Sequence, residues 1–457
     1  MIWNPRHVKW LVALLGLLTL VSAIWPVYRS FLIADININE AWNAYFADAA
    51  YRGSKLYPSR DQFITNNYPP VGFYILGASG ALVGDTVLTG RLLSLLAIAA
   101  IAIAAGLIVR HWNGSRTSAL VGGLFCASGI CRFFPGYAGM NDPQLLAQAV
   151  MAIGFLGFLK AIEKDRGYLV PLVVMIFSGF IKHNIIAMPI VAFLWLGLQR
   201  PKRFLPLTGV STLVIVLGFA LCHFAYGLDF WRNLRTPRSY NARLALDSLA
   251  VLQWPLVALV VWVYAGIALR NQPVVKFCNV WVIVSLLAFV LQRASEGVAE
   301  NAMFDLVIAL SVGIGIAFAK AHEMPLARHY NPERLRAGVL MAICIRLLTT
   351  PGNEPVRLFF DPGFQEEIAM RDAAMRESVA KAKETPGDVL SAAIVSYRAG
   401  KPFIVDTFNF QQRVKAGELS SSALEDRIAA GTLTRVQANP YHAWCNSRGS
   451  WGRPRIE

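Results

Sequence analysis

Charged residues are scarce in this chain of 457 residues. They make up 16% of it, whereas soluble domains carry about 25%. The deficit is concentrated between Leu11 and Thr349, where apolar stretches of roughly membrane-spanning length alternate with short polar loops. This excludes a water-soluble fold for that region. Soluble composition returns after Pro351, so we predict two domains, a transmembrane domain at 1–350 and a small soluble domain at 351–457.

Cysteine and several catalytic patterns are also missing. Only one of the six cysteines, Cys445, lies in the polar tail, and the others lie in or beside apolar segments. No disulfide framework and no metal-binding spacing follows from them. The tail contains no phosphate-binding loop and no nucleophile triad. A divalent cation is permitted by carboxylates from two loops, but no cofactor is compelled.

Positive charge is abundant, with a formal net charge of +15. The basic residues do not gather on one soluble face, and most lie in short loops beside apolar segments, as they do in cytoplasmic loops of membrane proteins. Nucleic acid is therefore not an expected partner, whereas membrane lipids are.

The loop charges predict a topology. Basic loops are expected in the cytoplasm, and they contain Arg6/Lys9, Arg110/Arg116, Lys160/Lys164/Arg166, Arg200/Lys202/Arg203, Arg270/Lys276 and Lys320/Arg328/Arg334. About eleven helices then cross the membrane, at 10–26, 91–109, 117–134, 143–160, 168–181, 185–199, 204–225, 250–269, 275–292, 302–320 and 335–349. The N-terminus is cytoplasmic, its first segment a retained anchor, and the tail is extracytoplasmic, which indicates a multi-pass protein of the cytoplasmic (inner) membrane.

Two apolar regions do not fit simple crossings. Residues 68–84 are short, rich in glycine and begin at Tyr68-Pro69-Pro70, so we predict a helix lying at the outer interface. The segments 168–181 and 185–199 are each short for a full span. We predict that they form a hairpin whose tip, Lys182-His183-Asn184, lies near or below the outer surface.

Ionisable and amide side chains collect on the predicted outer side, where their cost at membrane depth makes them informative. The first outer loop carries Asp35, Asn39 and Glu40, and Glu40 has the simpler interpretation of a solvated loop charge. In the second outer loop Asp142 precedes a helix, so it either caps that helix or acts in chemistry. Asp305 lies about one turn inside a predicted crossing helix, where capping or an interhelix hydrogen bond is the simpler role.

Basic residues lie on the same side. A buried Lys182 needs an anionic partner, and a phosphate group is one candidate. The outer loop 226–249 holds Arg232, Arg235, Arg238 and Arg243, which fits a lipid head group or a departing phosphate, or else an interfacial helix on anionic lipids. Together the groups suit a reaction in which a carboxylate deprotonates an acceptor hydroxyl while basic residues hold the phosphate that departs.

Several short motifs resemble those of the C-type (GT-C) membrane glycosyltransferases, which include protein O-mannosyltransferases and the lipid A aminoarabinose transferase. Asn39-Glu40-Ala41-Trp42 resembles their Asp-Glu motif, and Asn67-Tyr68-Pro69-Pro70 resembles their His-Tyr-Pro-Pro element. Further matches, weaker and in the same order, are Gly90-Arg91-Leu92-Leu93, Asn141-Asp142-Pro143, Gly179-Phe180-Ile181-Lys182-His183-Asn184 and Asn301-Ala302-Met303-Phe304-Asp305. The resemblance covers about residues 5–320.

The resemblance implies an all-α polytopic membrane domain of GT-C type with outer juxtamembrane helices and a small α/β C-terminal soluble domain. It implies a polyprenyl-phosphate sugar donor, an acceptor that is a glycan, lipid or protein, and inversion at the anomeric carbon. Carried over, it places Glu40 and Asp142 near the reacting centre and Lys182 near the lipid phosphate. With the other polar residues of the predicted outer side, the candidate site is then catalytic Glu40, Asp142 and Asp35; donor and phosphate binding by Lys182, His183, Arg238 and Arg235; and cavity residues Asn39, Asn67, Tyr68, Asn141 and Asn301.

Asn39 departs from the family pattern, which has aspartate there. A neutral amide cannot act as a general base. Either Glu40 or Asp35 takes that role, or the register of the motif is shifted, or activity is lost.

The tail is predicted to be a small α/β unit. We expect a helix at 364–384, strands at 389–396, 403–405 and 433–437, and helices near 408–416 and 421–430. We hypothesise that this domain covers the outer cavity or helps to bind the acceptor.

The leading function is a glycosyltransferase that moves a sugar from a polyprenyl-phosphate carrier to an acceptor on the outer face. A transporter or flippase for lipid-linked saccharides is the alternative, but it predicts inverted repeats and polar residues near mid-membrane, and the sequence contains no convincing repeat. Asn39 also keeps open a catalytically silent protein of the same fold.

Overall fold

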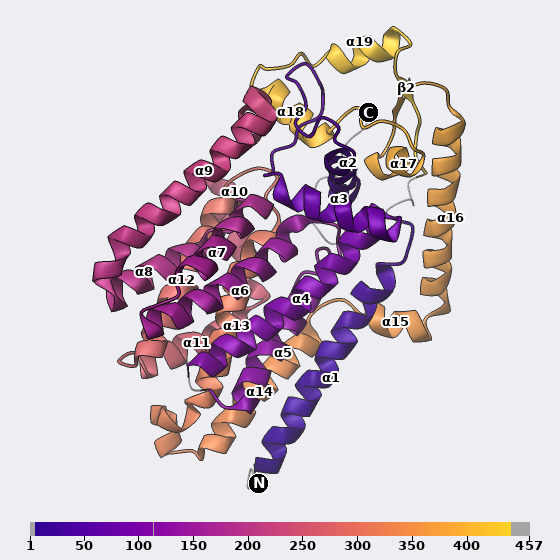
Figure 1. The fold of residues 1–457 in the computed structure, drawn as a ribbon. Coiled ribbons are helices and arrows are strands. Elements are labelled where there is room, and N and C mark those ends of the chain that lie inside the picture. The colour runs from indigo at the N-terminus through magenta and orange to yellow at the C-terminus, as the bar shows by residue number, and fades with distance from the viewer. Residues whose placement is uncertain (1–4, 113, 440–457) are drawn as a thin grey trace.

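Helices dominate the computed structural model, which describes residues 5–112 and 114–439 (Figure 1). The α-helices of the membrane domain are α1 (Pro5–Arg29), α2 (Asn39–Tyr51), α3 (Val71–Val83), α4 (Thr86–His111), α5 (Arg116–Phe133), α6 (Pro143–Lys164), α7 (Leu169–Ile181), α8 (Ala187–Gln199), α9 (Pro201–Leu234), α10 (Ala242–Asp247), α11 (Leu256–Ala268), α12 (Pro273–Arg293), α13 (Phe304–Ala319) and α14 (Pro332–Thr349). Cys445 lies outside the described residues.

Six described helices are long and apolar enough to cross a bilayer, and two bent pairs raise the number to eight. The six lie at Arg6–Arg29, Thr86–His111, Pro143–Lys164, Pro201–Leu234, Pro273–Arg293 and Glu300–Ala319. The predicted polytopic all-α membrane domain is therefore confirmed, with fewer full crossings than the roughly eleven expected from loop charges. The difference has two sources: some helices are too short, and α5 is diluted by glycine, serine and arginine.

Three apolar helices are too short to cross the membrane, and two of them, α7 and α8, were counted among the eleven expected crossings. Helices α3, α7 and α8 have 13 residues each, which is about 20 Å of helix against a hydrocarbon thickness of about 30 Å. They correspond to the region at 68–84 predicted to be interfacial and to the two arms of the predicted hairpin. Helix α3 packs on α2, where Phe46 and Phe73 meet edge to face with ring centroids 5.7 Å apart.

Helix α13 forms the centre of the membrane domain. The most apolar stretch of Glu300–Ala319, which contains this helix, is 94% buried inside the protein. The helix packs between α4, α5, α11 and α12. Small residues let the backbones approach: a Cβ on Gly122 of α5 would lie 3.0 Å from the Ser311 carbonyl oxygen of α13. Helix α9, by contrast, lies along one side of the bundle (Figure 1). Only 11% of its most apolar stretch is buried inside the protein, so its apolar surface faces lipid.

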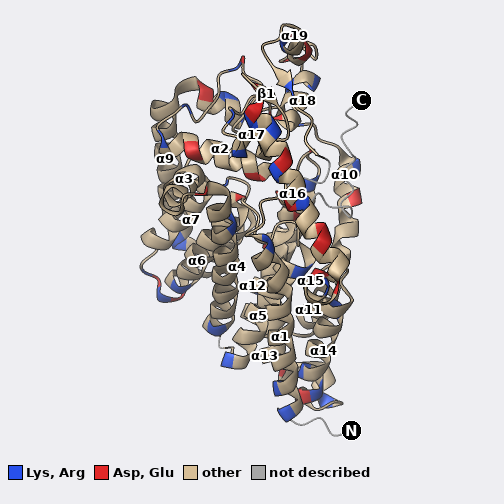
Figure 2. Cartoon of the chain, turned by 90° about the vertical axis from the view of Figure 1, so that its right-hand side faces the viewer, with Lys and Arg blue, Asp and Glu red and all other residues tan. Residues whose placement is uncertain are grey.

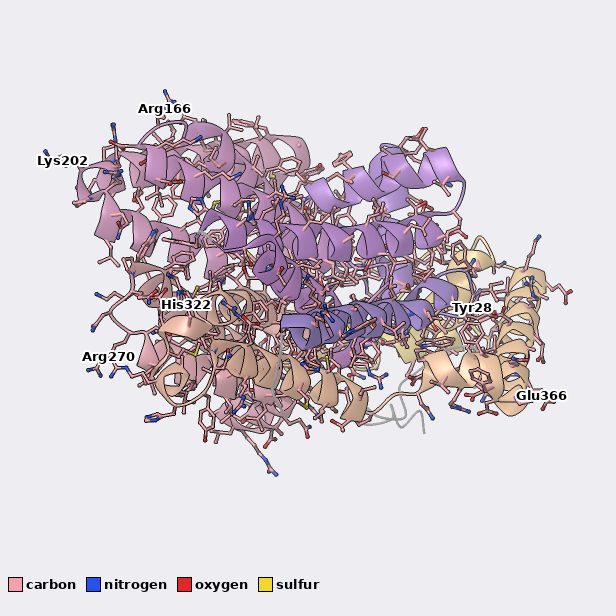
Figure 3. All side chains as sticks on the ribbon, turned by 90° about the horizontal axis from the view of Figure 1, so that it is seen from below. Tyr28, Arg166, Lys202, Arg270, His322 and Glu366 are labelled. Atoms are coloured by element: carbon pink, nitrogen blue, oxygen red, sulfur yellow. The ribbon has the colours of Figure 1, made fainter. Side chains whose placement is uncertain are left out.

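The two ends of the molecule differ in charge. Lys and Arg gather at the end that holds the N-terminus, whereas residues of both signs lie at the opposite end with α2 and the C-terminal helices (Figure 2). Arg166, Lys202 and Arg270 project away from the helices in the view from below (Figure 3). The loops that the sequence identified as basic therefore share one end of the bundle.

The tail packs on the end of the bundle where α2 and α3 lie (Figure 1). Its elements are α15 (Glu354–Phe360), α16 (Pro362–Glu384), β1 (Val389–Leu390), α17 (Ala393–Arg398), α18 (Thr407–Lys415), α19 (Ala423–Ala429) and β2 (Thr434–Arg435). Strands β1 and β2 pair in parallel over two residues each. The expected strand at 389–396 is wrong beyond Leu390, because α17 forms there and packs Ile394 and Val395 on α2. Tertiary packing outweighs the β-propensity of these residues.

Candidate functional site

A buried ion pair joins α2 to α4. Nε and Nη2 of Arg91 donate to Oε1 and Oε2 of Glu40 at 2.8 and 2.6 Å, and both side chains are at most 1% exposed. The remaining N–H groups of Arg91 donate to the carbonyl oxygens of Leu32 (2.6 Å) and Ala34 (2.9 Å). The Arg91 guanidinium therefore holds both α2 and the loop that precedes it against α4.

Further contacts saturate the Glu40 carboxylate. Its two oxygens also accept from the backbone N–H groups of Ile36 (2.7 Å) and Asn141 (3.0 Å). Burial alone would raise the pKa of Glu40, but the charge and hydrogen bonds of Arg91, with these two N–H groups, lower it below its usual range. An ionised carboxylate with four donors on it is a structural anchor. It is poorly placed to take a proton from an acceptor.

The loop between α5 and α6 is held against the same anchor. Asn141 donates from Nδ2 to the Glu40 carbonyl at 2.9 Å, and its own carbonyl accepts from Asn43 at 2.8 Å. A Cβ on Gly90 would lie 1.8 Å from Oδ1 of Asn141. Only glycine allows the loop to approach α4 so closely.

Asp142 both caps a helix and pairs with Lys182. Its Oδ1 accepts from the backbone N–H of Gln144 at 2.7 Å, as an N-cap of α6. The same oxygen lies 2.7 Å from Nζ of Lys182, and the two residues are 8% and 2% exposed. Both roles considered for Asp142 are therefore present, and Lys182 has the anionic partner that its burial requires. A small cleft between α3, α4 and α6 is lined by Asn43, Asn141 and Asp142.

Basic and aromatic groups surround this pair at the hairpin tip. Nζ of Lys182 lies 4.6 Å from the Tyr68 ring centroid, and the rings of Tyr68 and His183 are 6.4 Å apart. Desolvation in this recess, followed by the charges of Lys182 and Arg238, lowers the pKa of His183 to about 4, although part of the residue stays exposed. His183 is therefore neutral near pH 7.

Arg238 lies close enough for its charge to act on both Tyr68 and His183. Its Nη1 is buried without a hydrogen-bond partner in the described part of the chain, as is Oδ1 of Asn67. Arg235 differs, because it is exposed and its guanidinium lies over Trp231 at 5.5 Å. Of the four predicted phosphate-binding residues, Lys182, His183 and Arg238 come together, and no contact brings Arg235 to them.

Asp35 lies close enough to the Glu40–Arg91 pair for both charges to act on it. It is 2% exposed, and its Oδ1 has no hydrogen-bond partner among the described residues. Burial, and next the negative charge of Glu40, raise its pKa to about 7. Asn39, half-buried, begins α2.

Asn301 and Asp305 link α13 to the same region. Asn301 donates to Oε1 of Gln144 at 3.3 Å, which joins it to the helix that Asp142 caps. Asp305, 3% exposed, faces Gln148 and the first N–H of α8. These contacts match the interhelix role expected for Asp305. No group of three His, Cys, Asp or Glu that could hold a metal ion occurs within residues 5–112 and 114–439.

Arg91 is the functional residue that sequence reasoning missed. Among the sequence motifs it occurs only within Gly90-Arg91-Leu92-Leu93, yet it holds the loop before α2 and, through Glu40, the loop before α6. Its signal in the sequence is a lone arginine inside a long apolar run, since a charge at that depth needs a partner.

No protein-family model matches this chain. It is 25% identical over 323 residues to the undecaprenyl phosphate-α-4-amino-4-deoxy-L-arabinose arabinosyl transferase of Pseudomonas paraeruginosa, a match that covers 65% of this chain. The match spans 57% of the length of that protein.

Two solved structures share the fold. ArnT from Cupriavidus metallidurans in the apo state superposes with a TM-score of 0.59 at 12% identity, covering 92% of this chain and 88% of ArnT. The same enzyme bound to undecaprenyl phosphate gives 0.60 at 13% identity, with 90% and 89% covered. The resemblance predicted from the motifs is confirmed: this chain is an integral membrane protein with the fold of a C-type membrane glycosyltransferase.

Proposed function

We propose that this protein transfers a sugar from a polyprenyl-phosphate donor to an acceptor at the outer face of the cytoplasmic membrane. The observation that carries the proposal is the buried Asp142–Lys182 pair, 2.7 Å apart. Arg238 lies close enough to act on the neighbouring His183, and its Nη1 has no hydrogen-bond partner among the described residues. The undecaprenyl phosphate bound to a protein of the same fold supports this class of donor.

In the proposed reaction the acceptor hydroxyl gives its proton to a carboxylate and its oxygen attacks the anomeric carbon. The bond from that carbon to the phosphate oxygen breaks, and the polyprenyl phosphate leaves with the bonding electron pair. Lys182 and Arg238 stabilise the negative charge that grows on the phosphate, and neutral His183 supplies a hydrogen bond.

Asp142 is the carboxylate we assign as the base. It lines the cleft, and only one of its oxygens, Oδ1, accepts the bonds to Lys182 and Gln144. A phosphate that draws Lys182 toward itself would leave Asp142 free to accept the proton. We assign Glu40 to positioning, through Arg91, and retain Asp35 as the alternative base because its pKa suits that role.

The test uses the purified full chain in lipid nanodiscs with a radiolabelled polyprenyl-phosphate sugar and membrane extract as the source of acceptor. We expect Asp142→Asn to lower kcat roughly 10²- to 10⁴-fold, and Lys182→Met to raise the KM for the donor. Glu40→Gln should instead lower the thermal unfolding temperature, since breaking a buried ion pair costs roughly 3–5 kcal/mol.

Lys276→Met is the matched control, because Lys276 is exposed at the start of α12. Equal transfer by wild type and all variants would remove Asp142 and Lys182 from the site. Absence of transfer by folded wild type with every donor tried would favour a transporter or a silent protein.

A further inference from the structure

Helix α18 of the C-terminal domain lies directly against Arg238. The guanidinium carbon of Arg238 is 4.8 Å from the centroid of the Phe408 ring, a distance at which cation and ring attract each other. A ring covers only the flat face of a guanidinium, whereas its N–H groups point outward in the plane. Phe408 therefore orients Arg238 and leaves its hydrogen-bond donors free for a ligand. This agrees with Nη1, which has no partner among residues 5–112 and 114–439.

The same helix is fastened to both outer segments beside Arg238. Oε1 of Gln412 accepts from the backbone N–H of Ser239 at 3.2 Å, and Nε2 of Gln412 donates to Glu296 at 2.7 Å. Lys415 also pairs with Glu296 at 2.7 Å. The two segments are joined to each other, because the N–H of Glu296 donates to the Ser239 carbonyl at 2.9 Å. Helix α18 therefore holds the loop that contains Arg238, through a hydrogen bond to the next residue, Ser239.

The Phe408 ring packs against the backbone of a glycine, Gly297. Gly297 has φ +82°, and a Cβ there would lie 2.2 Å from the ring of Phe408. On the other side of α18, Arg413 donates to the Gln62 carbonyl at 2.7 Å, and the N–H of Asp406 donates to the Phe63 carbonyl at 3.0 Å. Three outer segments therefore fix the position of the ring.

We propose that Phe408 is a positioning residue for the donor phosphate: it holds the Arg238 guanidinium so that the C-terminal domain completes the donor-binding site. The inference rests on the proposed function. It assigns the domain to the donor rather than to the acceptor, because Phe408 contacts Arg238, which the proposed function assigns to the phosphate.

Two measurements on the full chain in nanodiscs test it: binding of undecaprenyl phosphate alone, and initial rates of sugar transfer. We expect Phe408→Leu to weaken binding and raise the donor KM roughly tenfold, with kcat at saturating donor changed less than about twofold. Phe408→Tyr, which keeps the ring, should restore wild-type affinity.

Phe403→Leu is the matched control. Phe403 belongs to the same domain and stacks on Tyr45 of α2, with ring centroids 4.9 Å apart and planes 7° apart. It contacts α2 rather than Arg238, so its variant shows whether loosening the domain on the bundle is enough to weaken donor binding. Equal loss of affinity in Phe403→Leu and Phe408→Leu would overturn the inference.

A double-mutant cycle separates this inference from the proposed function. If Phe408 acts through Arg238, then Phe408→Leu should have little further effect in an Arg238→Ala background. Weaker binding in Arg238→Ala but not in Phe408→Leu would overturn only the role of Phe408. Unchanged binding in Arg238→Ala would instead remove Arg238 from the donor site and the inference with it.

Discussion

At the scale of single residues, Asp35 couples the stability of the protein to pH. Its pKa rises from 3.8 to about 7 in the folded chain, while the unfolded chain keeps the ordinary value. Between these limits the folded state binds a proton that the unfolded state releases. Stability contributed at this site is therefore full below about pH 4 and is lost as the pH rises through 7.

Replacing the carboxyl by an amide removes this dependence. Asp35→Asn should unfold at a higher temperature than wild type at pH 8, with a gain of at most roughly 4 kcal/mol, and by a clearly smaller margin at pH 5. Thermal unfolding of the purified protein at both values measures it. Asp247→Asn, at an exposed carboxyl, is the control. Parallel pH dependence of wild type and Asp35→Asn would show that Asp35 is ionised in the folded protein.

Single residues also show what the sequence could reveal about the site. The burial of Lys182 followed from the short apolar segments on either side, and so did its need for an anion. Its partner did not, because Asp142 lies 40 residues earlier and pairing across loops leaves no local pattern. Glu40 could be taken as a solvated charge only because Arg91, 51 residues later, was not recognised as its partner.

At the scale of elements, the approach of the second outer loop to α4 depends on Gly90. Gly90→Ala would place a Cβ 1.8 Å from Oδ1 of Asn141, and the loop would have to withdraw from Glu40. We expect lower thermal stability and reduced transfer, although alanine is the better helix former by roughly 1 kcal/mol.

Gly179→Ala provides the matched comparison for that substitution. Gly179 also lies in a helix, α7, and a Cβ there meets nothing within 4 Å. It should be neutral or slightly stabilising, and unfolding temperatures with transfer rates for both variants measure the contrast. Equal behaviour of Gly90→Ala and Gly179→Ala would mean that the close approach is not needed.

Elements differ in how well their sequences predict them. The short helices α3, α7 and α8 are predictable from the sequence, because length alone separates a short apolar run from a full span. The strand expected at 389–396 failed, since Ile394 and Val395 suit a strand or a buried helix face equally well in isolation. Packing of α17 on α2 decides between them, and that contact joins residues about 350 positions apart.

At the scale of the whole molecule, the charge asymmetry predicts orientation. The end with Arg166, Lys202 and Arg270 (Figure 3) should lie in the cytoplasm and the C-terminal domain outside.

In a Cys445→Ser background a membrane-impermeant maleimide should label Ser420→Cys in intact spheroplasts. It should label Lys202→Cys only after permeabilisation. The five described native cysteines are buried, so they stay unlabelled. The reverse pattern would invert the topology and move the proposed reaction to the cytoplasmic face.

The shortness of α7 and α8 has a consequence for the surrounding bilayer. Helices of about 20 Å beside full-length spans create a hydrophobic mismatch, and lipid adapts to such a mismatch by thinning locally. Head groups would be drawn inward on the side where the hairpin tip carries Lys182. A lipid-borne phosphate could then meet that lysine at its own depth in the leaflet, and the membrane itself would become part of how the substrate is delivered.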